Sequence, residues 1–390
     1  MTDDLYLLHL LNDFNIYNFF FDFVNYLFLL LIFTFCYRYK FFSKRMFIVL
    51  LLCSLGPFFI NFFLIEWWFM PDQAKYFQET HQFRDYLISG LSYTIISDSA
   101  EYIRLPSLIL AFMPIPFIET INSIGFIHKG LLGIFTITLF HKKYIDKYFF
   151  YFLNLCPSIF LYSSLSLKDN LVLIYCLLII LSIIYYRGYL INIILIILLF
   201  YLRPLHAILL FVYFFTYNIC FSGKFLDLNI IIGILMLVAL YFKFEEIHGY
   251  FDRKRYSFFV ETGVIKNTYN ELDFTSFSVI KTLLKDTFRF ILSPLNNQLY
   301  LKLVIQSFEN FFLYAFGVYL SLKLYKLDRK KAIFWSLSCL FGLMSYGTLI
   351  VSDGTIARYR YSFLVIIIFA IYSELRNIKK LNLKSKIIGS

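Results

Sequence analysis

Long apolar runs separated by short charged segments dominate the chain from residue 17 onward. A helix needs about 20 mostly apolar residues to cross a hydrocarbon layer of about 30 Å, because each residue adds about 1.5 Å. The runs predict eleven transmembrane helices, at 17–36, 46–68, 122–140, 148–166, 170–186, 189–202, 205–221, 226–242, 303–322, 332–351 and 361–374. The segment 189–202 is short, and Pro204 marks a tight turn after it. We therefore expect an all-α, polytopic transmembrane protein with a single integral membrane domain over residues 1–390.

Two longer and more polar stretches interrupt the apolar runs, at about 70–121 and 243–301. The first contains the apolar segment 105–118, which is short for a span and holds three prolines. Proline removes a backbone donor from a helix, so we expect this segment to be re-entrant or interfacial rather than a regular transmembrane helix. In the second stretch, apolar residues recur at helical spacing over 280–291. This spacing predicts an amphipathic helix that lies on the membrane surface or covers a cavity.

Basic residues gather in every second connection between the expected spans. These connections carry 19 Lys and Arg residues against four acids. They are 38–45, 142–147, 187, 224–227, 323–331 and 374–386. By the positive-inside rule these connections are cytoplasmic, which places the N-terminus and both long loops on the extracytoplasmic side.

The composition favours the same class of protein. Of all residues, 60% are hydrophobic and 16% are charged, with a mean hydropathy of +0.71, a balance that a soluble domain does not need. The formal net charge of +11 is explained by the cytoplasmic connections, so no nucleic-acid partner is expected. The six cysteines have no CxxC pair and no histidine at ligand spacing, so neither disulfides nor a metal or other cofactor is expected. The first residues carry acids where a signal peptide carries bases, so no cleavage is expected.

Ionisable residues lie at the expected extracytoplasmic ends of four different hairpins. They are Asp72, Lys168, Asp169, Arg203, His206, Asp353, Arg358 and Arg360. Charged groups at the edge of the hydrocarbon are costly unless they are paired or functional, so their gathering on one face indicates a site. Each of them singly could also be a snorkelling or helix-capping residue.

The residue types on this face suit an anionic ligand that carries phosphates. Arginine offers a fixed fork of donors to phosphate oxygens, and lysine adds a point charge. A carboxylate or a histidine nearby can act as a general base toward a hydroxyl. Histidine is the side chain whose unperturbed pKa lies near neutrality, which makes His206 a candidate for that role.

Four short motifs carry a resemblance to a known family. They are Asp72 with Tyr76, the segment 157–169, the LRP turn at 202–204 and the GTxxRYR stretch at 354–360. In these motifs the chain resembles bacterial membrane glycosyltransferases of the GT-C class. In length, aromatic content and large exterior loops it is most similar to the O-antigen and capsule repeat-unit polymerases, the Wzy family.

The resemblance implies a GT-C-like fold in the bacterial inner membrane and transfer of a whole glycan from undecaprenyl diphosphate to an acceptor sugar hydroxyl, on the extracytoplasmic face. It implies catalytic roles for Asp72, Asp169 and His206. It implies substrate binding by Arg203, Lys168, Arg358, Arg360 and Tyr76. Arginines can stabilise the charge of the leaving diphosphate without a metal. The implied partners are the undecaprenyl-diphosphate-linked oligosaccharide, membrane lipid, a chain-length regulator and a flippase.

Two other functions remain open on the sequence. A GT-C enzyme that adds one sugar from a polyprenyl monophosphate would rely more on Asp72 as base and less on several arginines. A flippase or other transporter of lipid-linked oligosaccharides would belong to a different class. Transporters commonly show paired repeats with charges near the middle of the membrane. Here only Asp22, Glu119 and Glu309 lie at or near apolar interiors, and no internal repeat is evident.

Overall fold

The computed structural model describes residues 16–61, 72–90, 101–186, 189–222, 278–293, 301–350 and 353–388, together with residues 249 and 256. The regular structure within these ranges is helical, and no strand occurs in them. Six helical segments there are long and apolar enough to cross a membrane. They are Ile16–Arg38, Ile121–His141, Asp169–Tyr186, Pro204–Phe221, Arg329–Leu349 and Thr355–Leu381. The all-α fold class is thereby confirmed for the described residues, and the six apolar helices support the membrane-protein interpretation by their length and composition.

Each of these six segments coincides with an expected span. They belong to α2 (Ile16–Arg38), α7 (Ile121–His141), α10 (Asp169–Leu181), α12 (Pro204–Tyr217), α17 (Arg329–Leu349) and α18 (Asp353–Ile388). Short π-helical turns extend α10 over Ser182–Tyr186 and α12 over Asn218–Ser222. Two further helices, α11 (Tyr189–Leu202) and α16 (Leu301–Tyr325), lie on the expected spans 189–202 and 303–322.

The expected span 148–166 was wrong as a single helix. It consists of α8 (Lys147–Leu155) and α9 (Pro157–Tyr162). Between them Cys156 has φ −57° and ψ 122°, because the ring of the following proline disfavours a helical conformation at the preceding residue. Pro157 then occupies the first turn of α9, where its missing N–H is not needed.

Two other expected spans are only partly seen or not seen. Within 46–68, α3 (Lys44–Ser54) gives way to the short α4 (Gly56–Phe59), and residues 62–68 lie outside the described ranges. The expected span 226–242 also lies outside the described residues. In the first long loop, α5 (Asp72–Ser89) packs with α6 (Glu101–Ala111). With 11 residues, α6 is too short to cross a membrane.

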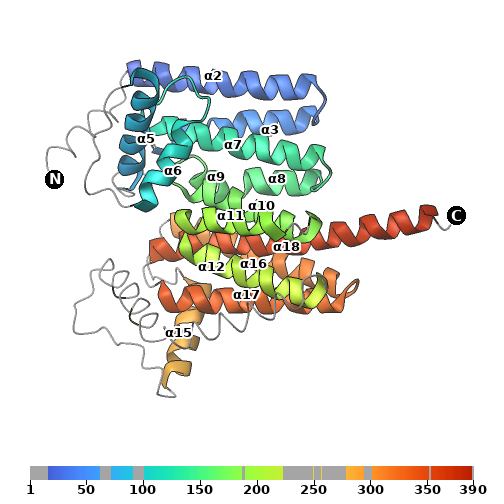
Figure 1. Cartoon of the computed structure of the whole chain (residues 1–390). Helices are drawn as coiled ribbons and strands as arrows, with labels where there is room; N and C mark the ends of the chain where they lie inside the picture. Colours follow the sequence, from blue (N-terminus) through green and yellow to red (C-terminus); the bar gives the residue numbers. More distant parts are fainter. Residues whose placement is uncertain are drawn as a thin grey trace. The chain divides into compact units, whose positions relative to one another are not determined.

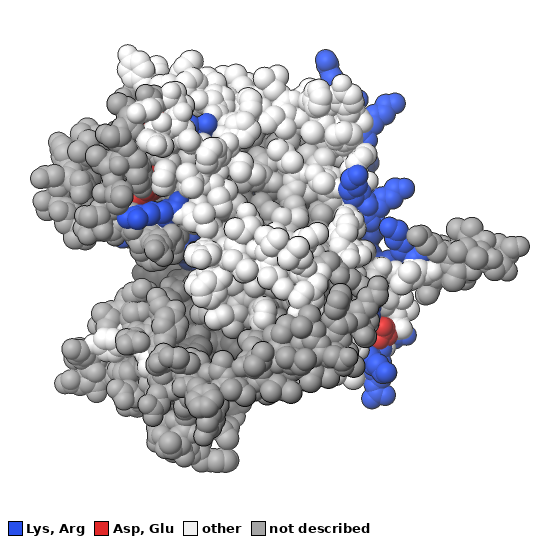
Figure 2. Space-filling view, viewed as in Figure 1, with Lys and Arg blue, Asp and Glu red and all other residues white. Residues whose placement is uncertain are grey.

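The chain forms two compact units. Unit 1 contains residues 1–178 and 197–207, and unit 2 contains 179–196 and 208–390. In unit 1, α2, α3, α7 and α8 lie side by side, and α5 and α6 lie at one end of them (Figure 1). The basic turns 38–45 and 142–147 lie together at the other end, where the rings of Phe41 and His141 are 4.6 Å apart. Figure 2 shows Lys and Arg side chains gathered over these turns.

In unit 2, α16, α17 and α18 pack against one another, and α15 (Ser278–Leu292) packs across α17. The fully buried carboxylate of Glu374 on α18 joins three helices. It accepts hydrogen bonds from the Tyr217 hydroxyl and the Lys331 ammonium, each at 2.6 Å. Each oxygen of this buried carboxylate therefore has a hydrogen-bond donor, and the two bonds fix α12 and α17 to α18.

Candidate functional site

The central contact of the candidate site is an ion pair between Arg203 and Asp169. The guanidinium Nη2 lies 2.6 Å from the carboxylate Oδ1, and the two side chains are only 4% and 0% exposed. Asp169 is the first residue of α10, and Arg203 lies at the junction where α11 ends and Pro204 starts α12. Two residues that the sequence placed on different hairpins are thus brought into contact. Arg203 is buried against its partner, whereas we had expected it to face outward.

Two histidines lie beside this ion pair. His206, in the first turn of α12, is buried and interacts electrostatically with Asp169 and Arg203. His128, on α7, is also buried and feels the charge of Asp169. Its backbone carbonyl accepts a hydrogen bond of 3.0 Å from the amide of Asn170, which holds α7 against the start of α10. We call these four residues, Asp169, Arg203, His206 and His128, the Asp169 cluster.

A second buried cation, Lys129, follows His128 on α7. Its ammonium donates to the Phe160 carbonyl at 2.9 Å and to the Ser163 hydroxyl at 2.8 Å. The same ammonium lies 4.0 Å from the centre of the Phe160 ring. Phe160 belongs to the last turn of α9, so Lys129 stabilises the carbonyl end of that helix. Lys168, expected as a substrate ligand, is largely buried just before the cluster.

The first turn of α5 lies against the segment that leads into the cluster. The side-chain oxygen of Gln73 accepts a hydrogen bond of 3.1 Å from the backbone N–H of Ser166. The Ser166 hydroxyl in turn donates to the carbonyl of Ile121 at the start of α7. Asp72, next to Gln73, is half-buried, and Tyr76, one turn further on, is buried. The helix that carries Asp72 and Tyr76 is therefore hydrogen-bonded, at its first turn, to Ser166, which lies two residues before Lys168.

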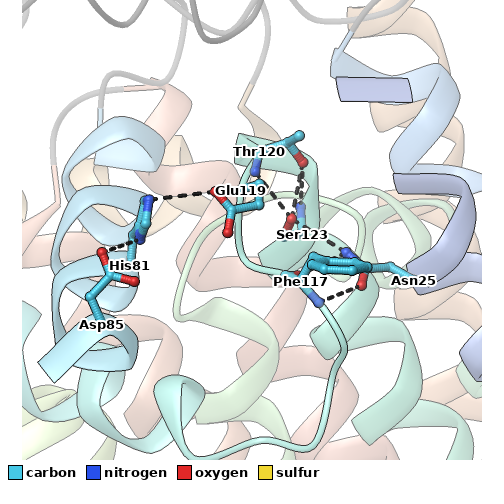
Figure 3. Close-up of polar contacts among 7 residues, drawn as sticks. All are labelled: Asn25, His81, Asp85, Phe117, Glu119, Thr120 and Ser123. Carbon is cyan, nitrogen blue, oxygen red and sulfur yellow. Dashed lines mark hydrogen bonds and ion pairs between the residues drawn. The ribbon is translucent and has the colours of Figure 1, made fainter. Parts of the chain in front are cut away.

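A buried polar network fixes the start of α7 to α2. The Asp22 carboxylate accepts hydrogen bonds from the Thr120 hydroxyl and from the amide of Asn122, the latter at 2.9 Å. The Asn25 amide donates to the carbonyl of Phe117 at 2.9 Å and accepts from its N–H at 3.1 Å (Figure 3). Asp22 therefore has a structural explanation: it holds the segment before α7 in place.

The segment before α7 is also held from α5. His81 lies between two carboxylates, with Nδ1 3.2 Å from Asp85 and Nε2 3.8 Å from Glu119 (Figure 3). Arg84 donates to the carbonyl of Met113 at 2.7 Å. These partly exposed contacts tie α5 to the connection between α6 and α7, so they position the helix that carries Asp72.

The two remaining expected ligands belong to unit 2. Arg360 is fully buried, and its Nη1 donates to the carbonyls of Phe290 and Ile291 at 2.7 and 3.1 Å. These carbonyls lie in the last turn of α15, so the guanidinium caps that helix. Arg358, on the same helix α18, is partly buried. A role for either in binding an anion stays a prediction.

Sequence reasoning missed His128, Lys129 and Gln73. The signal for the first two was present, because a histidine and a lysine interrupt an otherwise apolar run, and intramembrane ionisable residues are rarely incidental. No comparable signal marked Gln73, which matters through one backbone contact. Within the described ranges, no group of three or more His, Cys, Asp or Glu residues is arranged to hold a metal ion.

The chain was compared with protein-family models, with curated proteins and with solved structures. No family model, no curated protein and no solved structure matches it.

Proposed function

We propose that this protein is a GT-C-like membrane glycosyltransferase that polymerises lipid-linked oligosaccharide repeat units. It resides in the bacterial inner membrane with about eleven spans and works on the extracytoplasmic face. Its substrate is an undecaprenyl-diphosphate-linked oligosaccharide, and a chain-length regulator and a flippase are its expected partners.

The observation that carries the proposal is the Asp169 cluster. A buried ion pair is costly to form and gives little net stability, so its presence beside two buried histidines needs a further explanation. Orientation of a guanidinium toward a phosphate group is one such explanation, because Asp169 restricts the arginine to a single direction. The hydrogen bond between Gln73 and Ser166 holds the helix that carries Asp72 at the same end of unit 1 as the Asp169 cluster.

The proposed reaction is a displacement at the anomeric carbon of the donor glycan. The acceptor hydroxyl oxygen forms a bond to that carbon, and the bond from the carbon to the diphosphate oxygen breaks. The diphosphate leaves with the electron pair, and the hydroxyl proton passes to a base. Asp72, the half-buried member of the set, is the first candidate for that base, and His206 is the second. Arg203 and Lys168 stabilise the charge on the leaving diphosphate.

Purified protein supplied with one lipid-linked repeat unit tests the proposal. A polymerase yields a ladder of products spaced by one repeat, and cells that lack the protein accumulate single repeats on the lipid. Lengthening by one sugar only would instead assign the chain to the single-sugar transferases. Movement of the lipid-linked oligosaccharide across the vesicle membrane without any lengthening would assign the chain to the flippases. Either result would overturn the polymerase assignment.

A further inference from the structure

Helix α15 lies crosswise at one end of a membrane-length helix within unit 2 (Figure 1). Its contact with α17 is close at Gly347, where an added Cβ would come within 2.8 Å of the Thr287 Cα. Gly347 stands three residues before Ile350, which caps the end of α17, whereas the basic turn 323–331 precedes the start of α17. If α17 spans the membrane, a helix that crosses its end lies along the membrane surface, at the depth of the lipid headgroups.

The position of α15 is fixed by contacts at its carbonyl end. Besides the cap from Arg360, the guanidinium of Arg289 donates to the carbonyl of Ile350 at 3.3 Å. Asp286, Thr287 and Phe290 are buried on the side that faces α17 and α18. The face that α15 turns away from the protein is therefore determined by packing.

That outward face is apolar. Leu284, Phe288 and Leu292, spaced by four residues, are 48%, 60% and 52% exposed. We call these three residues the outer stripe. Lys281 and Lys285 are also exposed and lie on or beside the same face at its amino-terminal half.

We propose that the outer stripe of α15 inserts into the boundary between headgroups and acyl chains of the membrane, where Lys281 and Lys285 bind the phosphates of anionic phospholipids. The neighbouring helix α17 also exposes large apolar side chains, Leu337, Leu340 and Phe341. Lysines at such a boundary extend their ammonium groups toward the headgroups while their stems stay in the apolar layer. This surface is independent of the transferase proposal.

A fluorescent amino acid placed singly at position 284, 288 or 282 of the full-length chain tests the insertion. The protein is reconstituted in vesicles whose phosphatidylcholine carries a nitroxide on the acyl chain. Position 282 is the matched control, because it lies on the same helix away from the stripe. We expect quenching at 284 and 288 about twofold or more above that at 282, since an interfacial helix buries its apolar face by roughly 5–10 Å. Equal quenching at the three positions, or stronger quenching at 284 and 288 by iodide in water, would overturn the proposal. So would protection from both quenchers, which would show that a second copy or another protein surface covers the stripe.

A second arm tests the two lysines. Labelled phosphatidylglycerol should quench the probe at 284 more effectively than labelled phosphatidylcholine, with a preference of about fivefold at low salt. In the K281Q/K285Q variant this preference should disappear while acyl-chain quenching remains. A preference that persists in that variant would remove the lysines from the proposal.

Discussion

The guanidinium of Arg203 lies 2.6 Å from the carboxylate of Asp169, although 34 residues separate them. Both side chains are buried, so each charged group has lost most of its contact with water and is stabilised by the other. The pair fastens the start of α10 to the junction between α11 and α12. Its loss should therefore be felt in stability as well as in activity.

Removing one member of this pair should destabilise the protein more than removing both. Arg203→Met and Asp169→Leu should each lower the free energy of unfolding by about 3–5 kcal/mol, because the remaining charge stays buried without its partner. The double variant should lose less than either single variant, because neither buried charge remains. Unfolding curves of the four purified proteins in detergent measure this coupling, and strictly additive losses would show that the two residues do not act together.

Arg203 should also respond to substitution in a graded order of activity. Arg203→Lys keeps the charge but loses the planar fork, and Arg203→Ala loses both. A diphosphate contact in the transition state is worth roughly 2–4 kcal/mol, so polymer yield per folded protein should fall by about 30- to 1000-fold in the alanine variant. The lysine variant should lie between. Arg203 would have only a structural role if the lysine variant kept full activity and the alanine variant kept normal turnover per folded protein. In that case the alanine variant would differ only in its lower abundance.

Asp72 should matter for activity and little for folding. The half-buried Asp72→Asn variant keeps the shape of the side chain but cannot accept a proton, so polymer yield should drop while the melting temperature changes little. Asp85→Asn is the matched control, because Asp85 is an exposed carboxylate on the same helix and forms an ion pair with His81. A yield from Asp72→Asn as high as that of the unaltered protein would remove Asp72 from the catalytic set.

The orientation in the membrane is testable by thiol labelling. In a chain without other reactive cysteines, a membrane-impermeant reagent applied from outside should reach position 81 and should fail at positions 143 and 329. The charge bias of the connections is the reason, since positions 143 and 329 stand in basic turns. Labelling at 329 from outside would invert the topology and with it the proposed face of the site.

Two glycines in unit 2 should differ in their tolerance of a methyl group. An added Cβ at Gly347 meets the backbone of α15 at 2.8 Å, so Gly347→Ala should cost about 1–3 kcal/mol by displacing that helix. At Gly317 on α16 the nearest atom, on Ile368, is at an ordinary 3.6 Å, and Gly317→Ala should be neutral or stabilise by about 0.5–1 kcal/mol. Thermal unfolding measures both changes, and an unaffected Gly347→Ala variant would contradict the close packing of α15.

Much of the helical framework follows from the apolar pattern, because spans such as α2 and α7 are defined by length and hydropathy alone. The break between α8 and α9 was also visible as Pro157, but the total apolar length hid it. A hydropathy average depends on the number of apolar residues and does not register that one proline lacks the backbone N–H that a continuous helix needs.

The site was predictable as a set of residues but not as a set of contacts. The sequence singled out Asp169 and Arg203, yet nothing in it shows that they bind each other rather than a ligand. The same holds for Arg360, which donates to two backbone carbonyls that carry no sequence signal. Contacts of this kind depend on tertiary packing and become visible only in the folded chain.

The order of synthesis matters for the break between α8 and α9. The carbonyl of Phe160 accepts hydrogen bonds from Lys129 on α7 and from Ser164 nearby in the chain. The serine is local, so the carbonyl has a donor as soon as α9 is made, whereas Lys129 has neither of its acceptors, this carbonyl and the Ser163 hydroxyl, until then. Because α7 precedes α9 in the chain, the growing polypeptide presents the ammonium before its acceptors. An ammonium in lipid is costly without such partners, so we expect α7 to complete its insertion only after α9 has been made.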